Sequence, residues 1–250
     1  MKSNNLLIFE ISGEYGHFRK FNTTSSPLTY ATPTRPALAG LLGAVIGIER
    51  EVTPNNYREG VIPVNEVFNP DNSKIAVQIL NPTKKVRIGF NLLNTGKGAS
   101  SFYNITNRTQ IEFELLKDPH FRIFLWHEDQ NLLNDISTRI KNLNYHFTPY
   151  LGLAQFACLV EWNGLEIMDE VQRENTECDI ITSIDLSKLP TPHRINFKDG
   201  FYTTDTMPMA MQRNRIVTRY SEIFLEKNGL PVSVTTDQYW KTSFGNILFL

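Results

Sequence analysis

Hydrophobic residues recur along the first two thirds of the chain with two different periods, and each period predicts a kind of element. Residues 35–47 hold leucines and a valine at spacings of three and four, which places them on one face of an α-helix. Residues 129–142 repeat this spacing and predict a second helix. Short runs rich in β-branched and aromatic residues predict strands. These runs are residues 5–12, 75–80, 86–93, 111–116, 121–126 and 154–162.

The order of the predicted elements indicates the fold class. Strand, helix, strand, strand, helix, strand is the order of a ferredoxin-like sandwich, in which both helices cover one face of a four-stranded antiparallel sheet. We therefore predict an α+β fold with a ferredoxin-like (RRM-like) βαββαβ domain over residues 1–164, and a free second sheet face. A polar, glycine-containing excursion at residues 94–108 predicts a mobile hairpin or loop. Strand-like runs and proline turns predict a β-rich C-terminal extension, residues 165–250, packed on this domain.

The entry to the first predicted helix carries the most specific local signal. Two prolines stiffen it, and Thr34 is placed to cap the first turn, so the helix should start near Arg35. Gly40 and Gly43 inside this helix each cost roughly 1 kcal/mol relative to alanine. A neighbouring backbone or a ligand should therefore need the space of the missing side chains. For the glycines alone, close packing of the helix on a sheet is the favoured interpretation.

Composition excludes several classes of protein. The longest apolar run, residues 37–48, is too short to span a bilayer, and the N-terminus lacks a signal-peptide pattern, so we expect a cytoplasmic protein without a membrane partner. Cys158 and Cys178 form no CxxC pair, and the five histidines show no HxxH or HExxH spacing. The chain also lacks GxGxxG and P-loop motifs. We therefore predict no metal, no cofactor and no small-molecule substrate.

The formal net charge of -1 conceals an uneven distribution of charge. No acidic residue occurs between Glu14 and Glu49, or between Asp71 and Glu112. The second of these stretches contains interleaved aromatic residues and six cations, which are Lys74, Lys84, Lys85, Arg87, Lys97 and Arg108. A nucleic-acid surface would explain this pattern. Acid-free stretches also arise by chance in neutral proteins, so the pattern alone leaves both explanations open.

Several segments resemble a known family. The segments GEYGHFRKF (residues 13–21) and SSPLTYATPTRPALAGLLGAVIGIER (residues 25–50) resemble the N-terminal signature of CRISPR-associated protein family five, in the variety found with type I-B effector complexes. Residues 79–95, 108–129 and 150–162 are similar to later family segments in matching order and spacing. The remainder of the chain is similar only loosely.

The resemblance implies a subunit of Cascade, the multi-protein surveillance complex that carries a CRISPR RNA (crRNA) and finds invading DNA by base pairing. Members of this RAMP family bind the 5′ handle of the crRNA and have a ferredoxin-like core with a β-hairpin thumb. The thumb of this chain would lie around residues 82–108. The implied partners are the crRNA 5′ handle, the Cascade backbone subunit and the large subunit, with target DNA reached only through the complex.

Holding an unpaired RNA end requires cations for phosphates, planar groups for bases and places where the backbone comes close. The candidate RNA-binding residues are His17, Arg19, Lys20, Tyr30, Thr32, Thr34, Arg35, Gly40, Lys84, Lys85, Arg87, Lys97 and Arg108. For Tyr30, packing beside the helix entry and contact with RNA are equally open. The central hypothesis is that cations from separate segments converge on folding into a cradle for RNA.

The alternative function is a metal-independent endoribonuclease that processes precursor crRNA, as the type I-C relatives do. Such cleavage needs a base, an acid and cations around the scissile phosphate. The candidate residues of the right types are His17, Tyr30, Lys117 and His120. Lys117 and His120 are separated by two residues, whereas the cutting relatives carry an adjacent Lys-His pair. A non-catalytic subunit is therefore favoured, and a protein that only bridges other subunits is a further alternative.

Overall fold

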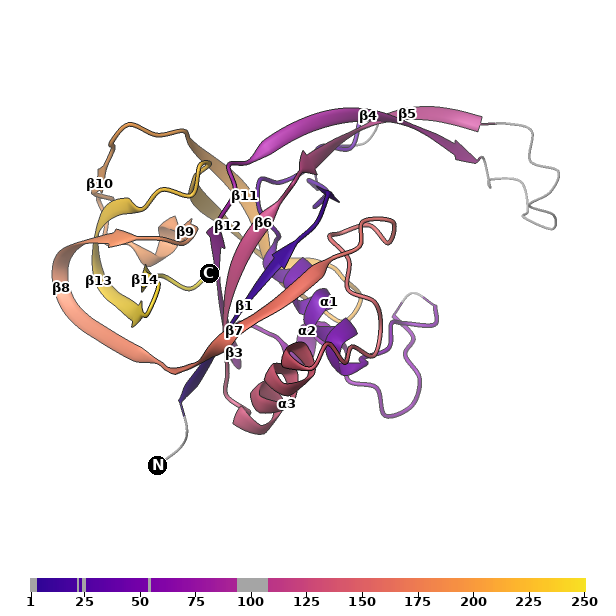
Figure 1. Ribbon diagram of the computed structural model, residues 1–250, viewed down its shortest axis with the longest axis horizontal. Coiled ribbons are helices and arrows are strands. Elements are labelled where there is room, and N and C mark those ends of the chain that lie inside the picture. The colour runs from indigo at the N-terminus through magenta and orange to yellow at the C-terminus, as the bar shows by residue number, and fades with distance from the viewer. Residues whose placement is uncertain (1–3, 22, 24–25, 54, 94–107) are drawn as a thin grey trace.

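The computed structural model describes residues 4–21, 23, 26–53, 55–93 and 108–250. This part of the chain is mostly β with few helices, which confirms the mixture predicted from the sequence (Figure 1). The elements are β1 (Asn5–Ser12), β2 (Tyr15–Gly16), α1 (Arg35–Ile46), α2 (Val64–Val67), β3 (Ser73–Ile79), β4 (Lys84–Leu93), β5 (Arg108–Lys117), β6 (His120–His127), α3 (Gln130–Lys141), β7 (Leu159–Ile167), β8 (Asp169–Ile180), β9 (Ile184–Asp185), a 3-10 turn (Leu186–Lys188), β10 (Ile195–Asn196), β11 (Tyr202–Met211), β12 (Val217–Glu226), β13 (Val232–Thr242) and β14 (Gly245–Ile247).

The central sheet has the strand order β3-β6-β1-β7, and every neighbouring pair in it is antiparallel. Successive side chains of a strand point to opposite faces of the sheet. Leu7, Phe9 and Ile11 of β1 therefore share one face, where they are buried in a core with Leu42 of α1 and Ile136 of α3. The two long helices lie on this side of the sheet (Figure 1).

The opposite face of the central sheet is not free, and the prediction of a free face is wrong. Leu6 and Ile8 of β1 and Phe124 of β6 are buried in a second core with residues of the C-terminal strands, among them Trp240. The segment NLLIFEIS is apolar at both sets of alternating positions, which is typical of a strand covered on both faces. The C-terminal extension supplies the second cover.

Apart from one 3-10 turn, every element that follows β7 is a strand. These strands form a sheet with the order β10-β13-β14-β8 and a smaller sheet with the order β11-β12-β9. The domain boundary expected at residue 164 falls inside β7, which continues to Ile167, so the chain enters the extension without a linker.

The helices in the described part of the chain are too short or too polar to span a membrane.

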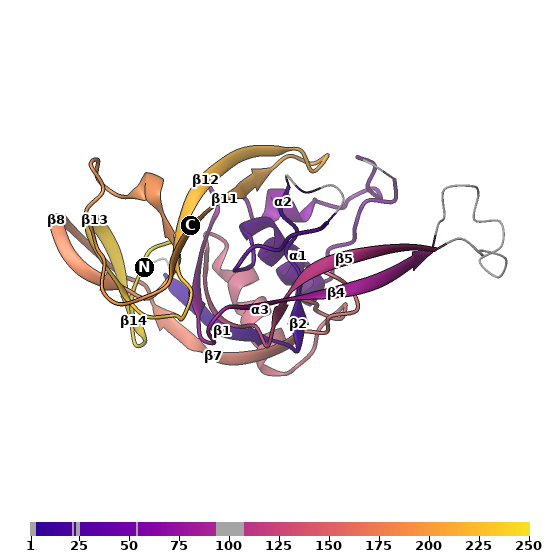
Figure 2. The ribbon, with the colours of Figure 1, turned by 90° about the horizontal axis from the view of Figure 1, so that it is seen from above.

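Strands β4 and β5 pair with each other from Lys84 opposite Lys117 to Leu93 opposite Arg108. They project from the body as a two-stranded ribbon, here named the β4–β5 arm (Figure 1, Figure 2). Both strands were predicted, but they form this arm and do not join the central sheet. The arm includes β5 up to Lys117 and so continues past the predicted thumb, residues 82–108. Most of the excursion predicted at 94–108 lies outside the described residues.

Candidate nucleic-acid interface

Three lysines from separate segments meet at the base of the β4–β5 arm. Lys85 lies in β4, Lys20 follows β2, and Lys227 follows β12 directly. All three line a cavity of about 270 Å³, together with Thr83 and Asp205. The backbone N–H of Thr83 donates to the Lys227 carbonyl at 2.7 Å, which holds the end of β12 against the start of the arm. The fold thus brings Lys20 and Lys85 together, as the sequence hypothesis required of its cations.

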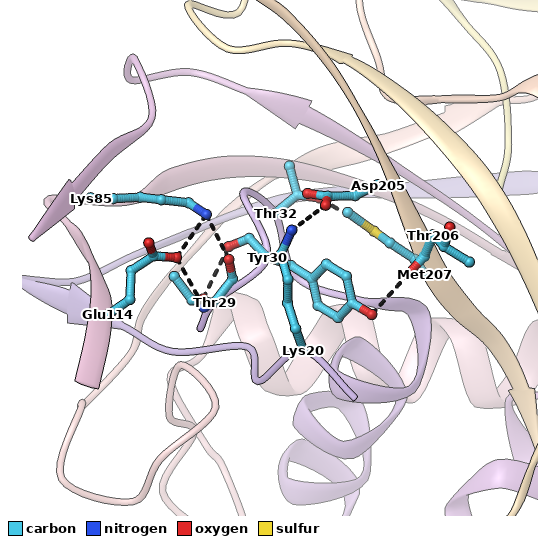
Figure 3. A network of polar contacts seen from close by, with 9 residues as sticks. All are labelled: Lys20, Thr29, Tyr30, Thr32, Lys85, Glu114, Asp205, Thr206 and Met207. Atoms are coloured by element: carbon cyan, nitrogen blue, oxygen red, sulfur yellow. Dashed lines mark hydrogen bonds and ion pairs between the residues drawn. The ribbon is translucent and has the colours of Figure 1, made fainter. Parts of the chain in front are cut away.

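Lys85 ties the arm to the segment that precedes α1 (Figure 3). Its Nζ donates to the Thr29 carbonyl at 2.7 Å and to Glu114 Oε1 at 2.9 Å, and the Thr29 N–H donates to the same carboxylate at 3.1 Å. Burial alone would raise the pKa of Glu114. The hydrogen bond and charge of Lys85, with the N–H of Thr29, outweigh burial and lower this pKa below its ordinary value. Glu114 is therefore ionised at neutral pH.

Lys20 forms an ion pair with Asp205 of β11, and its ammonium group lies 5.3 Å from the centre of the Tyr30 ring. Of the three lysines, Lys20 is thus paired with Asp205 and Lys85 with Glu114. Among the described residues, no ion pair includes Lys227 or its neighbour in this region, Lys84. Positive charge remains at the base of the arm after the two lysines with acidic partners have been neutralised.

Five of the predicted RNA-binding side chains are buried. They are His17, Tyr30, Thr32, Thr34 and Arg35. The Tyr30 hydroxyl donates to the Thr206 carbonyl of β11 at 2.9 Å, and Thr34 Oγ1 accepts from the Ala37 N–H at 3.4 Å as the N-cap of α1. The predicted cap is thus confirmed. In this conformation, burial keeps these five side chains away from RNA and gives them structural roles. The β11–β12 hairpin packs over the entry to α1 (Figure 2), whereas His17 is buried at the base of the arm.

His17 lies inside the junction between the arm and the body. Its Nδ1 is 2.8 Å from the Glu114 carbonyl oxygen, and its ring meets Phe113 edge to face at 5.4 Å between centroids. Burial is the main cause that lowers the pKa of His17 below its ordinary value of 6.5, so the imidazole is neutral at pH 7. A neutral, buried ring offers no charge to a phosphate.

Arg35 is buried although it is the first residue of α1. Its Nη2 donates to the carbonyls of Asn69 and Ser73 and to the Ser73 hydroxyl, at 3.1, 2.7 and 2.8 Å. Burial lowers the pKa of Arg35 to about 10, which leaves the guanidinium charged at neutral pH. Its Nε and Nη1 nitrogens are also buried, and neither has a hydrogen-bond partner within the part of the chain that the structure describes.

The other predicted residues lie at the surface or outside the described range. Arg19, Lys84, Arg87 and Arg108 are exposed, and Arg87 lies 3.5 Å from Glu112 across the arm. Gly40 is exposed on α1, away from the cavity of lysines. Lys97 falls outside the described residues. For these positions, contact with RNA stays a prediction. Lys227 was not predicted from the sequence, because no residue near it in the chain indicates that it meets the arm in the fold.

The four candidate nuclease residues have separate partners. Lys117 Nζ lies 3.1 Å from Asp118 and 3.4 Å from Glu14, whereas His120 Nε2 lies 2.6 Å from Glu10 on the central sheet. The other two candidates are the buried His17 and Tyr30 described above. The described ranges also contain no cluster of three or more His, Cys, Asp or Glu side chains that could hold a metal ion. Catalysis itself stays untested.

Comparison with solved structures identifies proteins with a similar fold. One belongs to a CRISPR RNA-guided surveillance complex, with a TM-score of 0.52 and 14% identity, covering 92% of this chain and 91% of that one. A CRISPR protein from Archaeoglobus fulgidus gives a TM-score of 0.53 at 10% identity, with 97% and 98% covered. A chain of the Type III-B Cmr-beta complex, bound to cognate target RNA, gives 0.52 at 9% identity, with 91% and 86% covered. At these identities the likeness shows a shared fold.

Comparison of the sequence with protein families gives the more specific result. No curated protein sequence matches the chain. A family described as CRISPR-associated protein (Cas_Cas5) matches residues 6–226. This range covers nearly all of the central sheet, the β4–β5 arm, Lys20, Lys85 and Asp205, and it ends one residue before Lys227. The family resemblance seen in the N-terminal segments therefore extends through most of the chain. The chain belongs to the CRISPR-associated protein family Cas_Cas5.

Proposed function

We propose that this protein is a non-catalytic, RNA-binding subunit of a type I CRISPR surveillance complex (Cascade) and that it holds the 5′ handle of the crRNA. The observation that carries this proposal is the cavity at the base of the arm, where Lys20, Lys85 and Lys227 meet. Membership of the Cas_Cas5 family supports it. So does the likeness of the fold to chains of two RNA-guided CRISPR complexes.

The charges around this cavity suit an RNA backbone. Phosphate binding is favoured where cations are not already neutralised by carboxylates. Lys227, which lines the cavity, and Lys84, which lines an adjoining recess together with Thr83, meet this requirement among the described residues. The exposed Arg87 and Arg108 would extend the path along the arm. An RNA tail that enters the cavity would therefore continue beside β4 and β5.

We also infer that β1, α1, β3, β6, α3 and β7 form a ferredoxin-like βαββαβ domain. The strand order β3-β6-β1-β7 and the antiparallel pairing support this assignment. RNA-recognition domains of this topology use the open sheet face. Here the C-terminal strands cover part of that face. We therefore place the RNA at the arm and not on the sheet.

The arm is also the proposed contact with the backbone and large subunits. An isolated two-stranded ribbon is only marginally stable in water. Leu92 and Leu93 at the end of β4 are 40% and 45% exposed, so the outer part of the arm offers apolar surface to a partner. Target DNA would be reached only through the assembled complex. The type I-B variety remains a prediction from the sequence.

The experiment that tests this function is incubation of the purified protein with labelled precursor crRNA in EDTA. We expect the RNA to be bound and to remain intact. Specific cleavage without a metal would overturn the non-catalytic assignment in favour of the endoribonuclease. Loss of the repeat-derived 5′ segment from the RNA should abolish specific binding, and a protein that binds no RNA at all would be a bridging subunit.

A further inference from the structure

A second, larger cavity lies on the glycine face of α1. Its volume is about 380 Å³, within the range of about 300 to 1,000 Å³ in which small-ligand pockets lie. Gly40 lines it from α1, Tyr57 from the segment that follows α1, Asn65 from α2, Tyr150 from the loop before β7, and Arg215 from the turn between β11 and β12. We call this cavity the α1 groove. It is separate from the cavity of lysines, with which it shares no lining residue.

The two glycines inside α1 differ in what surrounds them. A Cβ added at Gly43 would lie 2.8 Å from Val64 Cγ2, so packing of α2 against α1 requires a glycine there. A Cβ added at Gly40 would have nothing within 4 Å. Packing within the protein therefore explains Gly43 and leaves Gly40 without a structural reason. The bare helix surface at Gly40 leaves room for a flat group to lie directly against α1.

Planar and polar side chains form the walls of the groove. Tyr57 and Tyr150 supply two aromatic rings, and Tyr150 is 37% exposed. The Tyr57 hydroxyl donates to the Arg213 carbonyl at 3.1 Å, and the Arg215 guanidinium lies 2.7 Å from Glu51. These contacts join the turn between β11 and β12 to the segment that follows α1. They fix the walls at a set separation without filling the space between them.

A buried charge adjoins the groove. Arg35 lines a recess of about 40 Å³ whose lining shares Pro36, Asn65 and Met211 with the groove. The Nε and Nη1 nitrogens of Arg35 are buried and lack acceptors within the described part of the chain. A buried donor without an acceptor is unfavourable by about 1–3 kcal/mol. The groove therefore lies beside a buried positive charge that is not fully compensated within the described residues.

We propose that the α1 groove holds one unpaired nucleobase of the bound RNA. An unpaired base is flat and stacks on aromatic rings, which matches Gly40 and the two tyrosines. The acceptor atoms at its edge suit a groove that lies beside the buried charge of Arg35. A peptide strand would instead use a free sheet edge or an apolar groove with regular pockets. This inference rests on the proposed function, because it requires that the protein bind RNA.

The test uses the full-length protein and a single-stranded RNA of the repeat-derived 5′ segment, with 2-aminopurine placed at each position in turn. In the unsubstituted protein, one position should lose fluorescence on binding because its base stacks in the groove. Gly40→Leu fills the groove from a site with open space, so it should restore the fluorescence at that position and weaken binding at least tenfold. Tyr150→Ala should act at the same position. Asn134→Leu, which places a leucine on the exposed side of α3, is the control and should change neither reading.

An abasic nucleotide gives a second, independent reading. Removing the base at the quenched position should weaken binding to the unsubstituted protein and have no further effect on Gly40→Leu. If RNA binds with normal affinity to Gly40→Leu and every base keeps its fluorescence change, the inference is wrong while the proposed function stands. If Gly40→Leu impairs only assembly with other subunits, the groove is a protein contact and the inference is also wrong. A protein that binds no RNA defeats the proposed function itself.

Discussion

The ammonium group of Lys85 and the carboxylate of Glu114 lie 2.9 Å apart on the two strands of the β4–β5 arm, and both bind the backbone of Thr29. The side chains are 31% and 16% exposed. Lys85 was selected from the sequence as an RNA contact, yet its ammonium group binds this glutamate and the Thr29 carbonyl. Its first role is therefore to fasten the base of the arm to the segment before α1.

Lys85→Met should destabilise the protein by about 1–3 kcal/mol, because it leaves a partly buried carboxylate without its cation. Urea denaturation at pH 7 measures the change. Arg87→Met is the matched control, since Arg87 and Glu112 form an exposed pair 3.5 Å apart and should contribute less than about 1 kcal/mol. Equal losses of stability for the two variants would contradict this role.

Folding lowers the pKa of Glu114, so this carboxylate also makes stability depend on pH. Its contribution to the free energy of unfolding is complete above the ordinary pKa of 4.5 and decreases as the pH falls below that value.

His17 should make the stability of the protein decrease in mild acid. Because burial lowers its pKa below 6.5, the unfolded chain binds a proton in this range more readily than the folded protein. The free energy of unfolding should therefore fall as the pH decreases through 6.5, and His17→Gln should reduce that fall. The exposed His193 lies away from this junction, and His193→Gln is the control substitution. Retention of the full decline in His17→Gln would show that His17 does not cause it and would contradict the lowered pKa of this residue.

Tyr30→Phe should separate packing from RNA contact at this position. The substitution removes the hydrogen bond from the Tyr30 hydroxyl to the Thr206 carbonyl and should destabilise the protein by about 1 kcal/mol. RNA affinity, measured by filter binding at fixed salt, should not change because the ring is buried. Weakened RNA binding with unchanged stability would instead return Tyr30 to the RNA interface.

Alanine at the two glycines of α1 should have opposite effects on stability. Gly40→Ala should stabilise the protein by up to about 1 kcal/mol, because the helix gains propensity and the new methyl group has open space. Gly43→Ala should be destabilising by about 1–3 kcal/mol, because its Cβ would clash with Val64. Thermal unfolding of both variants measures this difference. A destabilised Gly40→Ala variant would mean that protein atoms occupy the space at Gly40.

Features set by neighbouring residues could be predicted from the sequence. The apolar and β-branched run at residues 5–12 predicted β1 with its observed bounds, and Thr34 caps α1 as its place before Arg35 indicated. The strands of the arm were also predicted, since their β-branched and aromatic residues are contiguous. Periodicity and capping depend on a few adjacent residues, so one sequence suffices to find them.

Features set by distant segments could not be predicted. The local sequence left packing and RNA contact equally open for Tyr30 and favoured RNA contact for His17, but the partner of Tyr30 is Thr206 and that of His17 is Glu114. The acid-free stretches likewise suggested unpaired cations, whereas Lys20 meets Asp205 across 185 positions of the chain. Lys227 was missed for the same reason. Charge counted along the sequence does not reveal which acids the fold brings to each lysine.

The salt dependence of RNA binding tests most directly whether the base of the arm binds phosphate. Affinity for the repeat-derived 5′ RNA should be measured across a series of salt concentrations for the unsubstituted protein, the Lys84→Ala/Lys227→Ala double variant and a Lys141→Ala control on α3. Each lost phosphate contact should reduce the slope of log affinity against log salt by about 0.7. We predict a weaker, flatter dependence for the double variant and an unchanged one for the control. An unchanged slope in the double variant would contradict an RNA site at the base of the arm.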